Sequence, residues 1–173
     1  MGDASKYEFD WELLGNIGVG RPNLGPLVGV ATYRLMQYSF RDVLERRYGS
    51  EVADEIFREA GKLAGAEYAR NVIGDQEDFP AFVKSVQDAL RNSKIGVVRI
   101  EEASPDARRF VLTVSEDLDC SGLPELGYEV CAYDEGFIAA LFESHTGVTF
   151  DVSEIDCWCT GDRTCRFEAV AVS

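Results

Sequence analysis

Apolar residues recur at three- and four-residue steps through the first half of the chain, which predicts helices. The first helix is expected over 27–48, the second begins at Ser50 and ends at Gly74, and the third begins at Asp78. Asp78 is a good N-terminal cap, and Gly74 a good C-terminal one. The segment 1–26 is rich in glycine and proline and lacks this periodicity, so it is expected to be irregular.

The period changes to that of strands in the second half. Strands are predicted over 97–100 and 110–114, joined by a turn at Pro105, and two more begin at Val148 and Phe167. A fourth helix is expected from Cys131 to Gly147. Helices followed by strand–strand–helix–strand–strand indicate an α+β fold with N-terminal helices packed on a mainly antiparallel sheet. With 173 residues and no long linker, we expect one domain, 1–173.

Two glycines four residues apart, Gly61 and Gly65, fall on one side of the second helix. They allow two interpretations. Either another backbone packs closely there, or the glycines form only a thin patch on a surface helix.

Charge narrows the range of partners. The net charge is −14, and such a surface repels phosphate backbones and anionic membranes, so neither nucleic acid nor membrane is an expected partner. The start of the chain has neither the basic residues nor the apolar run of a signal peptide, and no apolar stretch approaches a membrane span. We therefore expect a cytoplasmic protein, in which clustered cysteines more often bind metal than form disulfides.

Cysteines near the end of the chain suggest a metal site. Cys157 and Cys165 are equally far from Gly161, and in a hairpin with its tip there the two would face each other with Cβ atoms ~5 Å apart. Structural zinc takes four Cys, His or carboxylate ligands. Cys131 and Glu154 are possible further ligands.

Glu154 has the wrong phase for this site, because on a regular strand it and Cys157 point to opposite faces. The strand must bend or end near Ile155 for both to reach one ion. Cys159 and His145 are rival ligands. Buried structural thiols and a redox disulfide are the alternatives to a metal.

Catalytic machinery is not apparent. No nucleophile–base pair can be found, and His145 fits the end of a helix, where a donor suits the exposed carbonyls. The acidic runs are interpreted as solvated faces: Glu101-Glu102, 75–78 and Glu116-Asp117. The sequence therefore favours binding over catalysis without deciding whether the protein is an enzyme.

Three sequence motifs together resemble the vinyl-4-reductase domain. They are Cys131-Ala-Tyr-Asp-Glu-Gly-Phe137, Glu154-x2-Cys157 and Gly161-Asp162-x2-Cys165-x-Phe167. That domain also forms the sensor module of phenol- and xylene-responsive transcription activators. The resemblance implies a structural zinc held by three cysteines and a glutamate, which here are Cys131, Glu154, Cys157 and Cys165.

The same resemblance implies a fold related to haem-nitric-oxide-binding domains and TRAPP subunits, with dimerisation through the N-terminal helices. It also implies a pocket for a small hydrophobic or aromatic ligand beside the zinc. The expected pocket residues are Phe79, Phe82, Val86, Phe110 and Leu112, with Tyr128 and Tyr133 as polar anchors. The phenol-anchoring histidine and tryptophan of the sensors have no clear equivalent, so phenol itself is not predicted.

Three hypotheses for the function follow. The leading one is a zinc-stabilised sensor or carrier of a small hydrophobic molecule. The second is an enzyme or accessory protein of tetrapyrrole metabolism, although no nicotinamide or flavin fingerprint is present. The third is a protein-interaction module without a ligand, which a cavity filled by side chains would favour.

Overall fold

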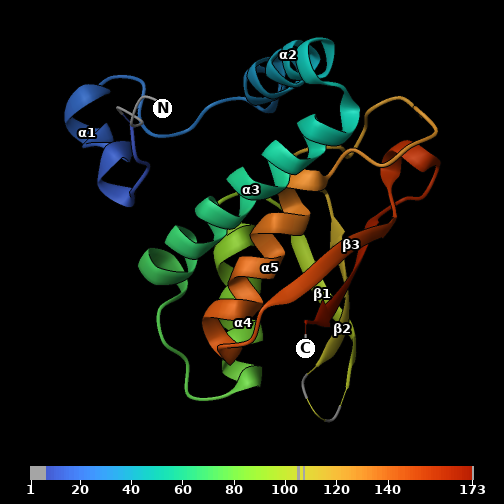
Figure 1. Cartoon of the computed structure of the whole chain (residues 1–173). Coiled ribbons are helices and arrows are strands. Elements are labelled where there is room, and N and C mark those ends of the chain that lie inside the picture. The colour runs from blue at the N-terminus through green and yellow to red at the C-terminus, as the bar shows by residue number, and fades with distance from the viewer. Residues whose placement is uncertain (1–6, 105, 107, 173) are drawn as a thin grey trace, which may run out of the picture.

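The computed structural model describes residues 7–104, 106 and 108–172 and confirms an α+β fold (Figure 1). The predicted turn residue Pro105 lies outside these ranges. The described helices are η1 (Trp11–Leu14), α1 (Ile17–Gly20), α2 (Val30–Tyr48), α3 (Ser50–Tyr68), the π-helical turn η2 (Ala69–Ile73), α4 (Phe79–Asn92), α5 (Ala132–Thr146) and η3 (Trp158–Thr160). The strands are β1 (Val97–Ala103), β2 (Arg109–Ser115), β3 (Phe150–Asp156) and β4 (Cys165–Ala171).

Most boundaries follow the local signals in the sequence. The Asp78 carboxylate accepts a hydrogen bond from the Ala81 amide and caps α4, as expected. Gly74 and Gly147 end their helices with φ of 66° and 71°, in the left-handed range that favours glycine. Two boundaries were predicted wrongly: the first long helix begins at Val30, and the segment before it contains two short helices.

The four strands form an antiparallel sheet in the order β1-β2-β4-β3. Helix α5 lies between this sheet and α3, with α4 beside it, so the molecule has a helix–helix–sheet layering (Figure 1). Because α5 is covered on both sides, most of its side chains are buried. The core lies between α4, α5 and the sheet.

Glycines let α3 and α5 approach closely, which confirms the first interpretation of Gly61 and Gly65. A Cβ atom on Gly61 would lie 2.0 Å from the Tyr133 carbonyl oxygen. On Gly65 it would lie 2.5 Å from the Phe137 carbonyl oxygen. Gly136 of α5 is the reciprocal contact, since its Cβ would lie 1.9 Å from the Arg58 carbonyl oxygen.

Helix α2 projects from the end of α3 and is less covered than the other long helices (Figure 1). Its exposed apolar side chains include Leu35, Met36 and Phe40, which are 72%, 67% and 60% exposed. Among the described residues no helix is long and apolar enough to cross a membrane.

Candidate metal centre and adjoining cavity

Four cysteine sulfurs from separate parts of the chain meet at one end of α5. They belong to Cys120, Cys131, Cys157 and Cys165, and all lie within 4.8 Å of one another. Cys131 is the N-cap residue of α5, Cys157 follows β3 and Cys165 begins β4. Each of the four is at most 1% exposed. The structure thus brings together three of the predicted ligands and adds Cys120.

The predicted bend near Ile155 is present. The pairing of β3 with β4 shifts between Glu154, opposite Phe167, and Asp156, opposite Arg166. The shift leaves Ile155 as an extra residue, a β-bulge, which lets Glu154 and Cys157 lie on the same side. The simple hairpin is corrected in one respect: Cys157 lies beyond the last strand pair and leads into η3.

Glu154, the predicted fourth ligand, lies beside the sulfur cluster. Its side chain is 9% exposed, and Oε2 accepts the Cys131 amide at 3.3 Å. Among the described residues Oε1 has no hydrogen-bond partner. Burial and the neighbouring Cys157 raise the pKa of this carboxyl to about 9.

The two rival ligands occupy different places. Cys159 is fully buried but is not part of the four-sulfur group, and its burial raises the pKa of its thiol to about 12. His145 is in the last turn of α5, whereas Cys131 precedes its first. At 1.5 Å per residue the two are about 21 Å apart along the helix, which is too far to share an ion.

The sulfur cluster has the chemistry of a closed metal site. Hydrogen bonding from Cys120 first, then from Cys131 and Cys165, lowers the pKa of the Cys157 thiol. Contacts within the cluster, again with Cys120 first, raise the pKa of the Cys131 and Cys165 thiols. The cluster alone therefore favours one thiolate stabilised by thiols, and a divalent cation would stabilise the others. Four buried sulfurs with no fifth position fit a structural zinc ion.

The loop that carries Cys120 is built from buried polar contacts. The Asp117 carboxylate accepts the amides of Asp119 and Cys120 at 2.7 and 3.0 Å. From α2, Arg34 donates to the Leu118 carbonyl at 2.8 Å, and Tyr38 donates to the Asp119 carbonyl at 3.0 Å. These contacts fix Cys120 at the cluster.

Two residues of this loop were misjudged or missed from the sequence. Asp117 was expected on a solvated face, but it is only 3% exposed. Burial raises the pKa of its carboxyl to about 7. The signal that was available for Cys120 is weak, because a cysteine in an irregular loop has no spacing that places it.

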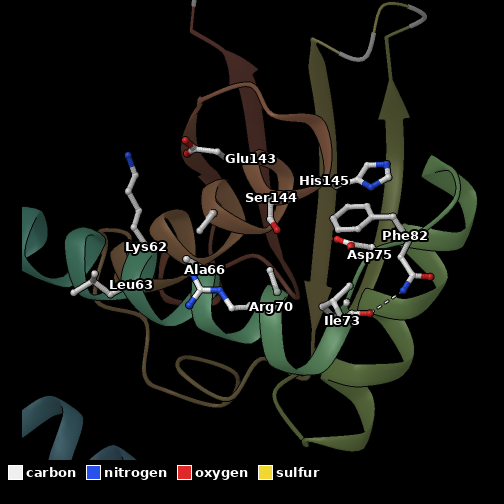
Figure 2. Close-up of a pocket in the computed structure, with 14 residues that line it drawn as sticks. Lys62, Leu63, Ala66, Arg70, Ile73, Asp75, Phe82, Glu143, Ser144 and His145 are labelled. Carbon is white, nitrogen blue, oxygen red and sulfur yellow. Dashed lines mark hydrogen bonds between the residues drawn. The ribbon is translucent and has the colours of Figure 1, made fainter. Parts of the chain in front are cut away.

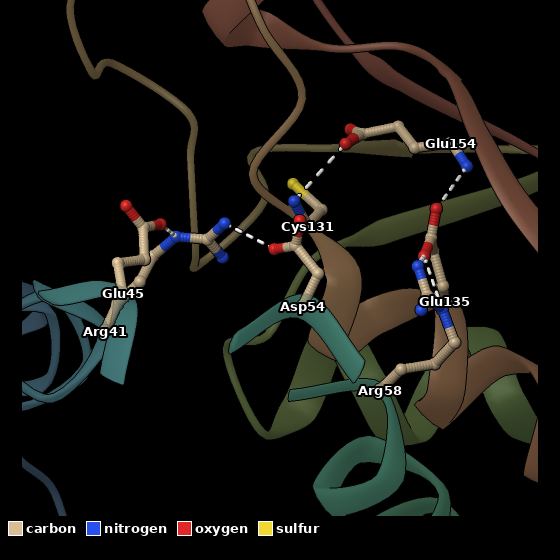
Figure 3. A network of polar contacts seen from close by, with 7 residues as sticks. All are labelled: Arg41, Glu45, Asp54, Arg58, Cys131, Glu135 and Glu154. Atoms are coloured by element: carbon tan, nitrogen blue, oxygen red, sulfur yellow. Dashed lines mark hydrogen bonds and ion pairs between the residues drawn. The ribbon is translucent and has the colours of Figure 1, made fainter. Parts of the chain in front are cut away.

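A chain of polar contacts links the cluster to α3 (Figure 3). The Glu154 amide donates to Glu135 Oε1 at 2.8 Å, and Arg58 of α3 donates to Glu135 Oε2 at 2.6 Å. Because Glu154 also contacts Cys131, this network connects β3, α5 and α3 beside the sulfurs.

An apolar cavity lies next to the cluster, between α4, α5 and the sheet. Three predicted pocket residues line it: Phe82, Val86 and Leu112. Its volume is about 40 Å³, so side chains fill most of the space. The carboxyl groups of Asp117 and Asp134 also line it, and among the described residues Asp134 Oδ2 is buried without a hydrogen-bond partner.

The remaining predicted pocket residues lie outside this lining. Phe79 and Phe110 stack on each other with ring centroids 4.9 Å apart and belong to the neighbouring aromatic core. Tyr128 is 52% exposed in the loop before α5, away from the cavity. Tyr133 is half-buried in the first turn of α5, and burial raises its pKa to about 12.

Phe82 separates the cavity from a larger surface groove (Figure 2). The groove has a volume of about 930 Å³ and runs between α3, the 74–76 loop and the end of α5. It carries both basic and acidic side chains, among them Lys62, Arg70 and Glu143. The ring of His145 stacks on Phe82 at this boundary.

The fold and the cysteine cluster define an α+β domain of the kind used for ligand binding. Residues 110–171 match the family model of the vinyl-4-reductase domain, which confirms the resemblance seen in the sequence motifs. Two uncharacterized proteins of Methanocaldococcus jannaschii are 24% and 26% identical over 103 and 104 residues. These matches span 60% of the chain and 58% of each relative's length.

Solved structures show the same fold. A vinyl-4-reductase family protein from M. jannaschii aligns with a TM-score of 0.62 and 15% identity, covering 99% of this chain and 100% of that one. The phenol-responsive sensory domain of the transcription activator PoxR gives 0.62 and 17%, covering 84% and 76%. A trafficking protein particle complex subunit 3 from Naegleria fowleri, covalently bound to palmitic acid, gives 0.65 and 13%, covering 83% and 95%. At these identities the likeness concerns the fold.

Proposed function

We propose that this chain is a metal-stabilised domain that binds a small hydrophobic or aromatic molecule and acts as a sensor or carrier. The observation that carries the proposal is an apolar cavity with two buried carboxyl groups at its wall, directly beside the sulfur cluster. The match to the vinyl-4-reductase domain and the fold shared with the PoxR sensory domain support it. The proposal treats 1–173 as one domain.

The proposed metal is zinc in a structural role. Cys131, Cys157 and Cys165 would hold it, with the fourth donor taken from their immediate surroundings, where the sequence predicted Glu154. A bound ion would fix the β3–β4 hairpin to the start of α5, which forms one wall of the cavity. Five unpaired cysteines suit the reducing cytoplasm, where we place the protein.

Ligand entry requires side chains to move. The cavity of about 40 Å³ is smaller than the ~150 Å³ that admits benzene in an engineered protein core. Phe82 lines both the cavity and the groove, so rotation of its ring would join the two spaces. The groove is then the route of entry, and His145 limits the rotation by stacking on Phe82.

The carboxyl groups select the ligand's polar end. Asp134 Oδ2 is buried and unpaired among the described residues, and an unpaired buried acceptor costs about 1–3 kcal/mol. A ligand that donates a hydrogen bond to it removes this cost. We therefore expect an apolar body with a hydroxyl or amino group.

Probe molecules that differ only in this group test the proposal. Phenol and benzylamine should raise the midpoint of thermal unfolding more than toluene does, because ligand binding to the folded state stabilises it. Asp134→Asn should abolish the difference between the probes. If none of the three shifts the midpoint of the wild-type protein at millimolar concentration, the binding proposal is wrong.

A second candidate function is a protein-interaction module, and the nearly filled cavity favours it. Its contact surface would be the exposed face of α2, with Leu35, Met36 and Phe40, against a second copy of the chain. Exposed apolar side chains grouped on one helix are typical of such contacts. Homodimerisation through α2 is also compatible with ligand binding, so the probe experiment separates the two functions.

A further inference from the structure

Cys120 is placed as a metal ligand although it lies outside the motifs that suggested a metal. It belongs to the group of four sulfurs, and it is fully buried. Its sulfur lies 3.0 Å from that of Cys165, and the sulfurs of Cys131 and Cys165 are 3.9 Å apart. With zinc–sulfur bonds of about 2.3 Å, the sulfurs of a tetrahedral site are about 3.8 Å apart. The cluster therefore approaches this geometry.

The competing donor is Glu154, and its surroundings give it a different role. Its Oε2 already accepts the Cys131 amide, and its own amide is held by Glu135. Carboxylates are harder ligands than thiolates, and a zinc ion with four thiolates has no position left for an oxygen. Hydrogen bonds to the groups around metal ligands orient those ligands, which is what the contact with Cys131 does.

The loop around Cys120 gives independent support. A cysteine in a mobile loop would need to be ordered for each binding event. Here Arg34 alone donates to the carbonyl oxygens of Leu118, Ser121 and Asp117, at 2.8, 3.0 and 3.3 Å. A sulfur held in place before the ion arrives loses little conformational entropy on binding.

We propose that Cys120 is the fourth ligand of a tetrathiolate metal site, completed by Cys131, Cys157 and Cys165, and that Glu154 positions Cys131 from outside the ligand set. The proposal rests on the metal part of the proposed function and makes it more specific. It selects soft, tetrahedral divalent ions, of which zinc is the usual occupant of four-thiolate sites. It also makes the loop after β2 part of the metal site.

Zinc-edge X-ray absorption on the purified wild-type chain tests the ligand set directly. We expect four sulfur neighbours at about 2.3 Å. Three sulfurs and one oxygen would overturn the role of Cys120 and leave the metal intact. A chain that binds no zinc would overturn the metal part of the proposed function as well. This measurement needs no variant.

Cobalt binding to matched variants gives a second test, because the sulfur-to-cobalt charge-transfer absorption grows with the number of thiolates. Cys120→Ser should lose about a quarter of the intensity, since one of four equivalent ligands is gone. Glu154→Gln should keep the full intensity. Cys159→Ser is the control, because Cys159 is equally buried but outside the four-sulfur group. Full intensity in Cys120→Ser with a changed spectrum in Glu154→Gln would contradict the proposal.

Discussion

The imidazole ring of His145 stacks on the phenyl ring of Phe82, with ring centroids 4.4 Å apart and planes inclined by 7°. The pair joins the last turn of α5 to the first turns of α4. It lies where the surface groove meets the apolar cavity, so it controls the proposed ligand route.

Truncating Phe82 should open this route. Phe82→Ala removes a ring that is only 4% exposed, and such changes cost about 3–5 kcal/mol of unfolding free energy. We expect the variant to bind benzene, measured as an increase in its unfolding midpoint. His145→Ala is the matched control, because Phe82 still closes the cavity. Equal benzene responses in the two variants would contradict the gate.

A methyl group at the contact between α3 and α5 should destabilise the fold. Gly136→Ala places a Cβ atom 1.9 Å from the Arg58 carbonyl oxygen, so the helices must separate. Overpacking of this kind costs about 1–3 kcal/mol, which denaturant unfolding can measure. Gly20→Ala is the control, because a Cβ atom there meets nothing within 4 Å. Similar stability of both variants would show that the close helix contact is not required.

Removing the side chain of Arg34 should weaken metal binding without touching a sulfur. Its guanidinium holds the carbonyl oxygens of the loop that carries Cys120. Changes outside the ligand set typically lower metal affinity 10–100-fold, and we expect about tenfold for Arg34→Ala in a zinc competition titration. The exposed Arg47 of the same helix provides the control variant, Arg47→Ala. An unchanged affinity in Arg34→Ala would mean that the loop is ordered by other contacts.

A charge on the exposed face of α2 should prevent dimerisation. Phe40 is 60% exposed, and Phe40→Glu would place a carboxylate in the centre of the proposed contact. Light scattering after size exclusion should find the wild type at twice the mass of the variant. Val172→Glu, a change at an exposed site far along the chain, should keep the wild-type mass. A monomeric wild type would contradict the dimer.

The helices and strands could be predicted because their signals are local. Asp78 caps α4 through its own side chain, and Gly147 ends α5 with a positive φ. The bend at Ile155 was also predictable, since Glu154 and Cys157 could not otherwise lie on one side.

The site could be predicted only in part, because its other members depend on long-range contacts. Cys120 reaches the cluster only because side chains of α2, more than 80 residues away in sequence, hold its loop. Asp117 was expected in solvent from its acidic neighbour, but the same loop buries it. The position of Phe82 between two cavities likewise depends on packing of α4 against the end of α5.

Native mass spectrometry of the freshly purified chain, before and after treatment with a chelator, tests the central claim most directly. We predict one zinc ion per chain, and a lower unfolding midpoint once the chelator removes it, because the ion joins the β3–β4 hairpin and the loop of Cys120 to α5. A chain with no bound metal, whose unfolding midpoint the chelator leaves unchanged, would contradict it.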